Sequence, residues 1–317
     1  MKQHYIPKCY LNEFTGADGK VATIDYNLVK QGTNPRIVFK APTQIGYEID
    51  YYTLDVDLPR PYQHLRNTKP YIIEQDIFWR YEKVYPAILE QIRNRRPLIR
   101  KQAELFIYAL ISMKLRNKYL LNSEMQKNLL KNVIANTRAD MLEESRILFP
   151  ELTTEEKLAT IKVVEEKIID NENFIKGANL MALLQRETNK EGVIIDIATK
   201  LFNCEWKIVE TDFSITFITS DNPGFCLDSS SIPFNTKFAD CTFIFPLTPT
   251  FCLIISDKKR DLEIKNDSLF KLIAYNEVKS DIISKINSHS MIFCNRYLIA
   301  GTKQTLESLN IQIKKTP

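Results

Sequence analysis

IFWRYEKVYPAILEQIRNRRP, residues 77–97, decides how the middle of this chain is expected to fold. Its apolar side chains recur at helical spacing and mark one face: Ile77, Tyr81, Val84, Ile88 and Ile92. The stretch therefore predicts a helix. Pro97 is expected at the first position of a second helix, where its missing N–H costs nothing.

The helical pattern extends outward over residues 72–203, for which we expect about five to six helices. A third helix is predicted from about Ser123 to Phe149. Thr153-Thr154-Glu155-Glu156 has the pattern of a capping box and predicts the start of a fourth. Shorter helices are expected between Phe174 and Phe202.

Short strand-like runs flank this helical block on both sides. In residues 1–60 they are Val21–Tyr26, Ile37–Phe39 and Tyr51–Leu54. In residues 204–317 they are Phe213–Thr219, Cys241–Leu247, Phe251–Ile255 and Arg296–Ala300, with a helix capped by Asp267 that reaches Ile292 and a last helix over Thr302–Asn310.

The order of these elements predicts an α+β fold. We expect a mixed or antiparallel sheet built from the N- and C-terminal parts, with residues 72–203 as a helical insertion. No linker rich in Pro, Gly or Ser marks a boundary, so the prediction is one domain over residues 1–317. Two separate domains are the alternative.

Composition excludes several classes of protein. Only 8 glycines occur in 317 residues, and neither GxGxxG nor GxxxxGK[ST] is present, which disfavours Rossmann-type and P-loop enzymes. No stretch approaches the ~20 apolar residues of a membrane span, and the N-terminus lacks a signal-peptide pattern. The six cysteines form no CxxC pair. A cytoplasmic protein without membrane contact, carrying reduced and mostly buried thiols, is expected.

Positive charge is concentrated in one part of the chain. Residues 60–140 hold 16 Lys/Arg against 7 Asp/Glu, a net charge of +9, whereas the whole chain carries +4. Residues 140–172 hold 10 acids and 4 bases. We favour mutual neutralisation of solvated helices, because runs of charge are usually solvated faces. The alternative is a basic face that binds nucleic acid or nucleotide phosphates.

Two signatures lie far apart in the sequence: His4-Tyr5-Ile6-Pro7, followed by Tyr10-Leu11 and Phe14, and Ser220-Asp221-Asn222-Pro223. Together they resemble the domain-of-unknown-function family 4238. Further matches are Trp206, Phe245-Pro246-Leu247, Asn287 and Arg296, so that the resemblance runs from about residue 4 to residue 300. Where this family usually has an aromatic residue, the chain has Cys9. The resemblance implies a mostly bacterial protein without an established reaction.

His4 has two interpretations. As a structural residue, it would hydrogen-bond a backbone carbonyl and fix the N-terminal segment. As a functional residue, it would be a general base or a metal ligand, because imidazole titrates near neutral pH. Pro7 holds Ile6 in an extended conformation, which suits either role.

Asp221 follows a predicted strand and is also open to two interpretations. Asn222-Pro223-Gly224 places Pro and Gly where a type II turn requires them, which favours a structural role of the motif in building a turn. Alternatively, Asp221 is a catalytic or metal-binding carboxylate at a strand end, with Ser220 and Asn222 as substrate contacts.

Glu82 and Arg116 complete the set of candidates. Pro86 cannot donate a hydrogen bond to the Glu82 carbonyl, so polar groups are expected to be free beside this carboxylate. Arg116 ends a polar stripe that recurs every four residues: Glu104, Tyr108, Ser112 and Arg116. The stripe is either the solvent edge of a helix or the lining of a polar cleft where Arg116 binds an anion. A structural salt bridge between Glu82 and Arg116 is the alternative to a catalytic role.

Two functions are consistent with these residues. The first is a hydrolase of a phosphodiester or nucleotide, in which His4, Glu82 and Asp221 act as acid, base or ligands of a divalent metal such as Mg²⁺ or Mn²⁺, and Arg116 stabilises phosphate charge. The second is a non-catalytic binding or effector protein of a bacterial stress or phage-defence system, in which the motif residues are structural. The sequence favours the first slightly, because two distant polar signatures suggest a shared site.

Overall fold

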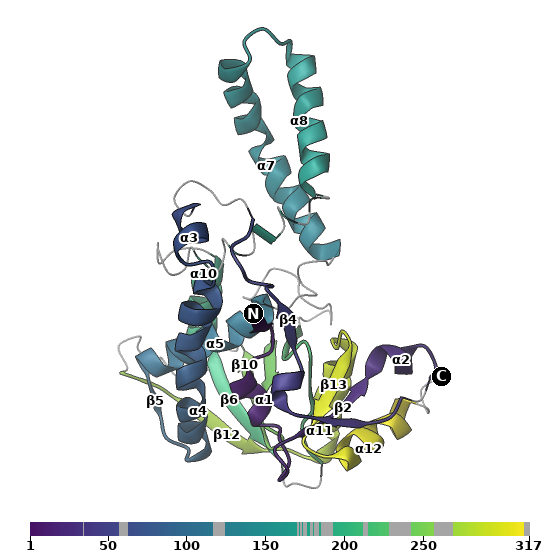
Figure 1. Cartoon of the computed structure of the whole chain (residues 1–317). Coiled ribbons are helices and arrows are strands. Elements are labelled where there is room, and N and C mark those ends of the chain that lie inside the picture. Colours follow the sequence, from purple (N-terminus) through teal and green to yellow (C-terminus); the bar gives the residue numbers. More distant parts are fainter. Residues whose placement is uncertain are drawn as a thin grey trace.

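A computed structural model of the protein describes residues 1–33, 35–56, 63–116, 124–169, 193–211, 215–227, 242–256 and 269–313, together with residues 171, 173, 176, 177, 180 and 184. The chain folds as an α+β protein, with strands near both ends and helices in the middle (Figure 1). The fold class predicted from the order of the elements is confirmed.

Both ends of the chain contribute to a four-stranded antiparallel sheet of order β3-β2-β13-β7. Its strands are β2 (Val21–Asp25), β3 (Val38–Lys40), β7 (Thr219–Ser220) and β13 (Tyr297–Ala300). Leu298 faces Ile24 on one side and Ser220 on the other. The second signature therefore begins inside a sheet that the N-terminal strands help to build.

The larger sheet has five strands in the order β12-β6-β10-β9-β8 and comes from the C-terminal part alone. Its strands are β6 (Glu205–Glu210), β8 (Phe225–Leu227), β9 (Thr242–Pro246), β10 (Phe251–Ser256) and β12 (Ile273–Glu277). The β12–β6 pair is parallel and the other pairs are antiparallel, so the sheet is mixed.

Short elements complete the N-terminal part. The strands β1 (Lys2–His4) and β4 (Tyr47–Ile49) pair antiparallel, with His4 opposite Tyr47. Between them lie the helices α1 (Lys8–Asn12) and α2 (Tyr26–Lys30) and the 3₁₀ turn Pro42–Gln44.

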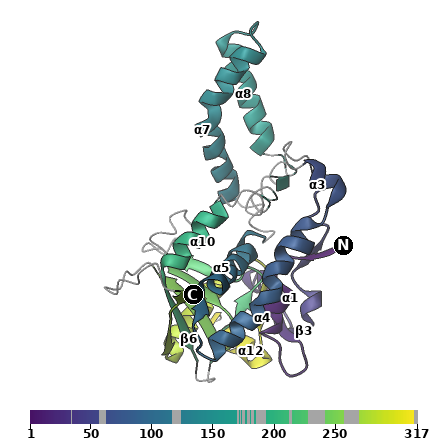
Figure 2. The same ribbon diagram turned by 90° about the vertical axis from the view of Figure 1, so that its left-hand side faces the viewer.

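The helical middle contains α3 (Gln63–Thr68), a π-helix (Ile73–Phe78), α4 (Trp79–Arg93), α5 (Arg100–Leu115), α7 (Glu124–Leu148), α8 (Thr154–Ile169) and α10 (Val193–Asn203). The helices α4 and α5 pack on each other and share the main core with the N-terminal segment and the five-stranded sheet. In contrast, α7 and α8 form a hairpin that projects from the body, as both views show (Figures 1 and 2). After the five-stranded sheet come α11 (Ser280–Ile292) and α12 (Lys303–Ile313).

Several boundaries differ from those predicted. Tyr51–Leu54 forms no strand, and the N-terminal pairing uses β4 instead. Pro97 does not open α5, because Leu98–Ile99 forms the strand β5, which pairs with β11 (Phe270–Lys271). Of the strand predicted over Phe213–Thr219, the described residues form a strand only from Thr219.

The helix predicted from Asp267 begins thirteen residues later, at Ser280. Asp267 itself lies outside the described residues, as does Cys241. Residues 273–277 form a strand because they pair in parallel with five residues of β6. Tertiary pairing thus overrides the helical spacing of a short segment.

Among the described residues, no helix is long and apolar enough to cross a membrane. The described cysteines are free thiols, four of them buried and Cys9 half-buried.

Candidate functional site

His4 ends β1 and lies against Tyr47 of β4, with 5.8 Å between the ring centroids. Its Nε2 atom is buried and has no hydrogen-bond partner among the described residues. Burial lowers the pKa of the ring, and the Glu82 carboxylate partly opposes this, whereas Arg116 adds to it. The imidazole is therefore neutral at pH 7 and able to accept a proton.

Arg116 lies at the end of α5 and is 1% exposed, which makes it one of the largest fully buried side chains described. Its Nη1 lies 2.9 Å from Oε1 of Glu82, whose side chain is 29% exposed. The guanidinium carbon lies 4.4 Å from the centre of the Phe78 ring. The salt bridge named as the structural alternative is thus present, and it connects α5 to the first turn of α4.

Glu74 belongs to the same group of side chains, although no sequence motif pointed to it. It lies on the π-helix, and its Oε1 is 3.5 Å from the backbone nitrogen of His4. Burial raises the pKa of Glu74, Glu82 adds to the rise, and Arg116 partly opposes it. Glu74 lies four residues before Phe78 and eight before Glu82. This spacing in the sequence would have predicted that the three side chains share one face of a helix.

We call His4, Glu74, Glu82 and Arg116 the His4 cluster. Three of its buried polar atoms have no hydrogen-bond partner among the described residues: His4 Nε2, Glu74 Oε2 and Arg116 Nε. Roughly 90% or more of buried polar groups in proteins are hydrogen-bonded, so three such atoms in one cluster are unusual.

Cys9 lies beside this cluster but is not an activated thiol. Burial raises its pKa to about 12, and the Glu82 carboxylate adds to the rise. A thiolate is therefore not available at neutral pH, and nucleophilic catalysis by Cys9 is not favoured.

Asp221 is fully buried immediately after β7 and is bonded to backbone. Its two carboxylate oxygens accept hydrogen bonds from the backbone N–H groups of Asn295, at 3.0 Å, and Arg296, at 2.9 Å. Burial raises its pKa to about 6, although these hydrogen bonds favour the charged form. These contacts are structural, but they differ from the local turn expected of this motif, because Asp221 binds the distant segment before β13.

Ser220 and Asn222 build the same corner. The Ser220 hydroxyl accepts from the Asn222 N–H at 3.1 Å and donates to the Asn222 carbonyl at 3.0 Å. The Asn222 amide donates to the Phe293 carbonyl at 2.9 Å and accepts from the ammonium group of Lys114. Burial lowers the pKa of Lys114 to about 8.

The two signatures meet through Tyr10 and through α5. The Tyr10 hydroxyl lies 2.6 Å from Thr219 Oγ1 and donates to the Pro246 carbonyl at 2.7 Å. Lys114 contacts the Asn222 turn, and Arg116, two residues later, joins Glu82. The structure therefore groups His4, Glu82 and Arg116, whereas Asp221, Asn222 and Ser220 form a second network at the other side of the α5 terminus.

The polar stripe on α5 passes from the surface into the interior. Glu104 is paired with Arg100 and its side chain is 40% exposed, whereas Ser112 is buried and donates to the Ala109 carbonyl. The stripe is thus exposed at Glu104 and buried at Ser112 and Arg116, and a polar cleft in which Arg116 binds an anion stays a prediction.

No group of three or more His, Cys, Asp or Glu side chains among the described residues could hold a metal ion. The joint metal role of His4 and Asp221 stays a prediction.

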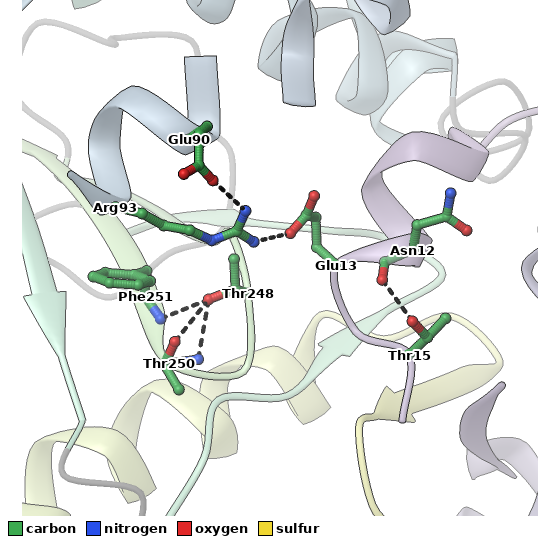
Figure 3. Close-up of polar contacts among 8 residues, drawn as sticks. All are labelled: Asn12, Glu13, Thr15, Glu90, Arg93, Thr248, Thr250 and Phe251. Carbon is green, nitrogen blue, oxygen red and sulfur yellow. Dashed lines mark hydrogen bonds and ion pairs between the residues drawn. The ribbon is translucent and has the colours of Figure 1, made fainter. Parts of the chain in front are cut away.

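Several charges of the basic region are neutralised within the fold. Arg93 lies between Glu90, at 3.5 Å, and Glu13 of the N-terminal segment (Figure 3). Arg95 pairs with Glu210 at 2.9 Å. These contacts neutralise Arg93 and Arg95 with acids outside residues 140–172, whereas Arg138 and Glu165 form a pair between the basic region and the acidic one.

Comparison with known proteins gave one family. The model of a family described as a protein of unknown function (DUF4238) matches residues 2–304. Searches of the curated proteins and of the solved structures found no match.

Proposed function

The chain belongs to the DUF4238 family, and we propose that it is a hydrolase acting on a phosphodiester or a nucleotide at the His4 cluster. The observation that carries the proposal is the set of unpaired buried atoms on His4, Glu74 and Arg116 around one ion pair. Perturbed pKa values that coincide with free hydrogen-bonding groups are more frequent at active sites than elsewhere.

The chemistry follows from the protonation states. Neutral His4 accepts a proton from a water molecule as its oxygen attacks phosphorus, and the bond from phosphorus to the leaving oxygen breaks. Glu74, whose pKa is raised, donates the proton that the leaving oxygen needs. Arg116 supplies a fixed positive charge in a buried setting, where it stabilises charge on the phosphoryl oxygens more than it would in water. A divalent metal such as Mg²⁺ or Mn²⁺ stays a prediction, and no step of this scheme is assigned to it.

The test is hydrolysis of bis(p-nitrophenyl) phosphate, a linear dinucleotide and nucleoside triphosphates, each with EDTA, Mg²⁺ or Mn²⁺. His4→Gln is expected to lower the rate by about 10²–10⁴-fold, the usual contribution of a general base. His64→Gln is the matched control, because His64 is exposed on α3. Absence of hydrolysis under every condition, or equal rates for both variants, would contradict the proposal.

The pH profile gives an independent readout. Because the pKa of His4 is lowered from 6.5 and that of Glu74 is raised from 4.5, the rate is expected to rise with pH below 6.5 and to fall once Glu74 loses its proton. Glu74→Gln should remove the falling limb and leave the rising one. A profile with neither a rising nor a falling limb between about pH 3 and about pH 9 would argue against this pair.

A second function, a non-catalytic binding or effector protein, is favoured by a different observation. The α7–α8 hairpin projects from the body and exposes large apolar side chains at its end. Such a patch is typical of a protein-binding surface. A role in a bacterial stress or phage-defence system stays a prediction from the family resemblance, and binding of nucleic acid through residues 60–140 stays a prediction as well.

A further inference from the structure

Polar contacts hold the end of the α7–α8 hairpin, residues 141–161, which we call the hairpin tip. Thr153 and Glu156 form a reciprocal cap at the start of α8, with bonds of 2.8 Å and 3.3 Å between side chain and backbone. Below the tip, Arg138 of α7 makes two bonds to the Glu165 carboxylate of α8, at 2.9 Å and 2.6 Å. The two helices are therefore held in register up to the loop.

The hairpin tip exposes a continuous apolar surface. Ile147, Leu148 and Phe149 are 76%, 66% and 50% exposed. Beside them is a hollow of about 200 Å³, lined mainly by Met141, Leu148, Phe149, Leu152 and Ile161. Small-molecule sites usually measure about 300–1,000 Å³. The smaller hollow suits the anchoring side chain of a macromolecular partner.

The charge around the hollow is negative. The hairpin tip, residues 141–161, carries five Asp/Glu and two Lys/Arg, a net charge of −3. This repels nucleic acid and anionic lipid surfaces, both of which bind basic segments. It also opposes contact between two identical tips. Electrostatic complementarity therefore selects a cationic partner.

We propose that the hairpin tip docks a cationic amphipathic helix of a partner protein. The apolar face of that helix inserts a large side chain into the hollow against Leu148 and Phe149, and its basic face lies beside Glu144 and Glu151. Apolar anchors at helical spacing are the general mode by which such helices enter grooves.

The experiment uses the full chain and two labelled helical peptides of about 18 residues, one built from Leu and Lys on opposite faces and one from Leu and Glu. Binding is followed by fluorescence anisotropy at about 0.15 M salt, where long-range steering is screened. The Leu/Lys peptide is expected to bind and the Leu/Glu peptide not. Leu148→Ser with Phe149→Ser should weaken binding by about tenfold or more.

Two further variants complete the design. Leu28→Ser on α2 is the matched control, since Leu28 is also exposed, at 40%, but lies on the body, and it should leave binding unchanged. Glu144→Lys with Glu151→Lys should reverse the preference between the peptides. The proposal is overturned by any of these results: no binding of the Leu/Lys peptide, equal binding by the tip variants, binding to anionic vesicles instead, or a dimer in sedimentation equilibrium that the tip substitutions abolish.

Discussion

Two buried charges of opposite sign are stabilised in different ways in this protein. Arg116 is paired with a carboxylate from another helix, whereas Asp221 is satisfied by backbone N–H groups. A buried charge needs such partners, because its transfer from water costs several kcal/mol otherwise. The difference matters for function, since Arg116 keeps a free Nε and Asp221 bonds through both oxygens.

Loss of Glu82 should leave Arg116 buried without its ion-pair partner. We expect Glu82→Ala to lower the free energy of unfolding by about 3 kcal/mol, the lower end of the range for buried pairs, because Glu82 is partly exposed. Adding Arg116→Met should recover part of this loss. Urea unfolding followed by circular dichroism measures both free energies of unfolding. Glu143→Ala is the control, because Glu143 forms an exposed pair with Arg146, and it should lower the free energy of unfolding by less than about 1 kcal/mol. If the effects of Glu82→Ala and Arg116→Met on the free energy of unfolding simply add in the double variant, the two side chains do not stabilise each other and the prediction is wrong.

Asp221 makes stability depend on pH in a direction opposite to that of most carboxylates. Its pKa is raised from 3.8 to about 6 in the fold, so between these values the folded state binds more protons than the unfolded chain. Stability therefore falls as pH rises from about 4 to about 6 and is level above that. At about 1.4 kcal/mol per pKa unit, the change amounts to about 3 kcal/mol.

Comparison with Asp221→Asn isolates this effect, because Asn does not titrate. The stability of the natural chain relative to the variant should decrease by about 3 kcal/mol from pH 4 to pH 7, measured by urea unfolding at each pH. A difference that stays constant with pH, or increases, would show that the carboxyl is not protonated in the fold at pH 4.

At the scale of elements, the turn between β7 and β8 depends on one glycine. Gly224 has a φ of +69°, and a Cβ there would lie 2.2 Å from Cδ2 of Phe245 in β9. Its carbonyl also accepts from Lys114 at 2.7 Å, so the turn is attached to α5. Both the positive φ and the close approach of Phe245 thus require glycine at position 224.

Gly224→Ala should accordingly be strongly destabilising. The left-handed backbone costs about 1–2 kcal/mol for a residue with Cβ, and the clash with Phe245 adds about 1–3 kcal/mol. We expect a lower Tm, measured by differential scanning calorimetry. Gly19→Ala is the control, because Gly19 has a similar φ of +69° but no atom within 4 Å of the added Cβ. Equal effects of the two substitutions would exclude the clash as a cause.

At the scale of the whole molecule, the side chain of Tyr10 contacts both main sheets, and Asn287 attaches α11 to the segment before β7. Tyr10 bonds Thr219 of the four-stranded sheet and Pro246 of the five-stranded one. Asn287 of α11 accepts from the Ile218 N–H at 3.0 Å and donates to the Thr216 carbonyl at 2.9 Å. These contacts predict that the sheets unfold together, as a single domain would.

Native cysteines report on each sheet separately. Cys252 lies in β10 and Cys294 lies between α11 and β13, and both are buried free thiols. Thiol labelling as a function of urea, quantified at each cysteine by mass spectrometry, should give the same midpoint for both. Two clearly separated midpoints would instead indicate two domains, the alternative that the sequence left open.

What the sequence determined by itself is the local pattern. The helical spacing around Ile77–Ile92, the cap at Thr153 and the strand Val21–Asp25 each depend on residues near one another in the chain. In these segments the local preference for helix or strand is sufficient for the prediction, because the packing of the fold stabilises the same secondary structure. Two distant polar signatures predicted one site of His4, Glu82, Arg116 and Asp221, whereas in the fold the Asp221 carboxylate bonds the backbone before β13.

Only the tertiary structure decided the rest. The strand β12 forms because β6 lies beside it, and Glu74 joins His4 because β1 passes the π-helix. Lys114 is buried because the Asn222 turn closes over it, a contact between residues 108 positions apart. Such features depend on which distant segments meet, and the free energy of burial, hydrogen bonding and strand pairing that selects them exists only once those segments are in contact.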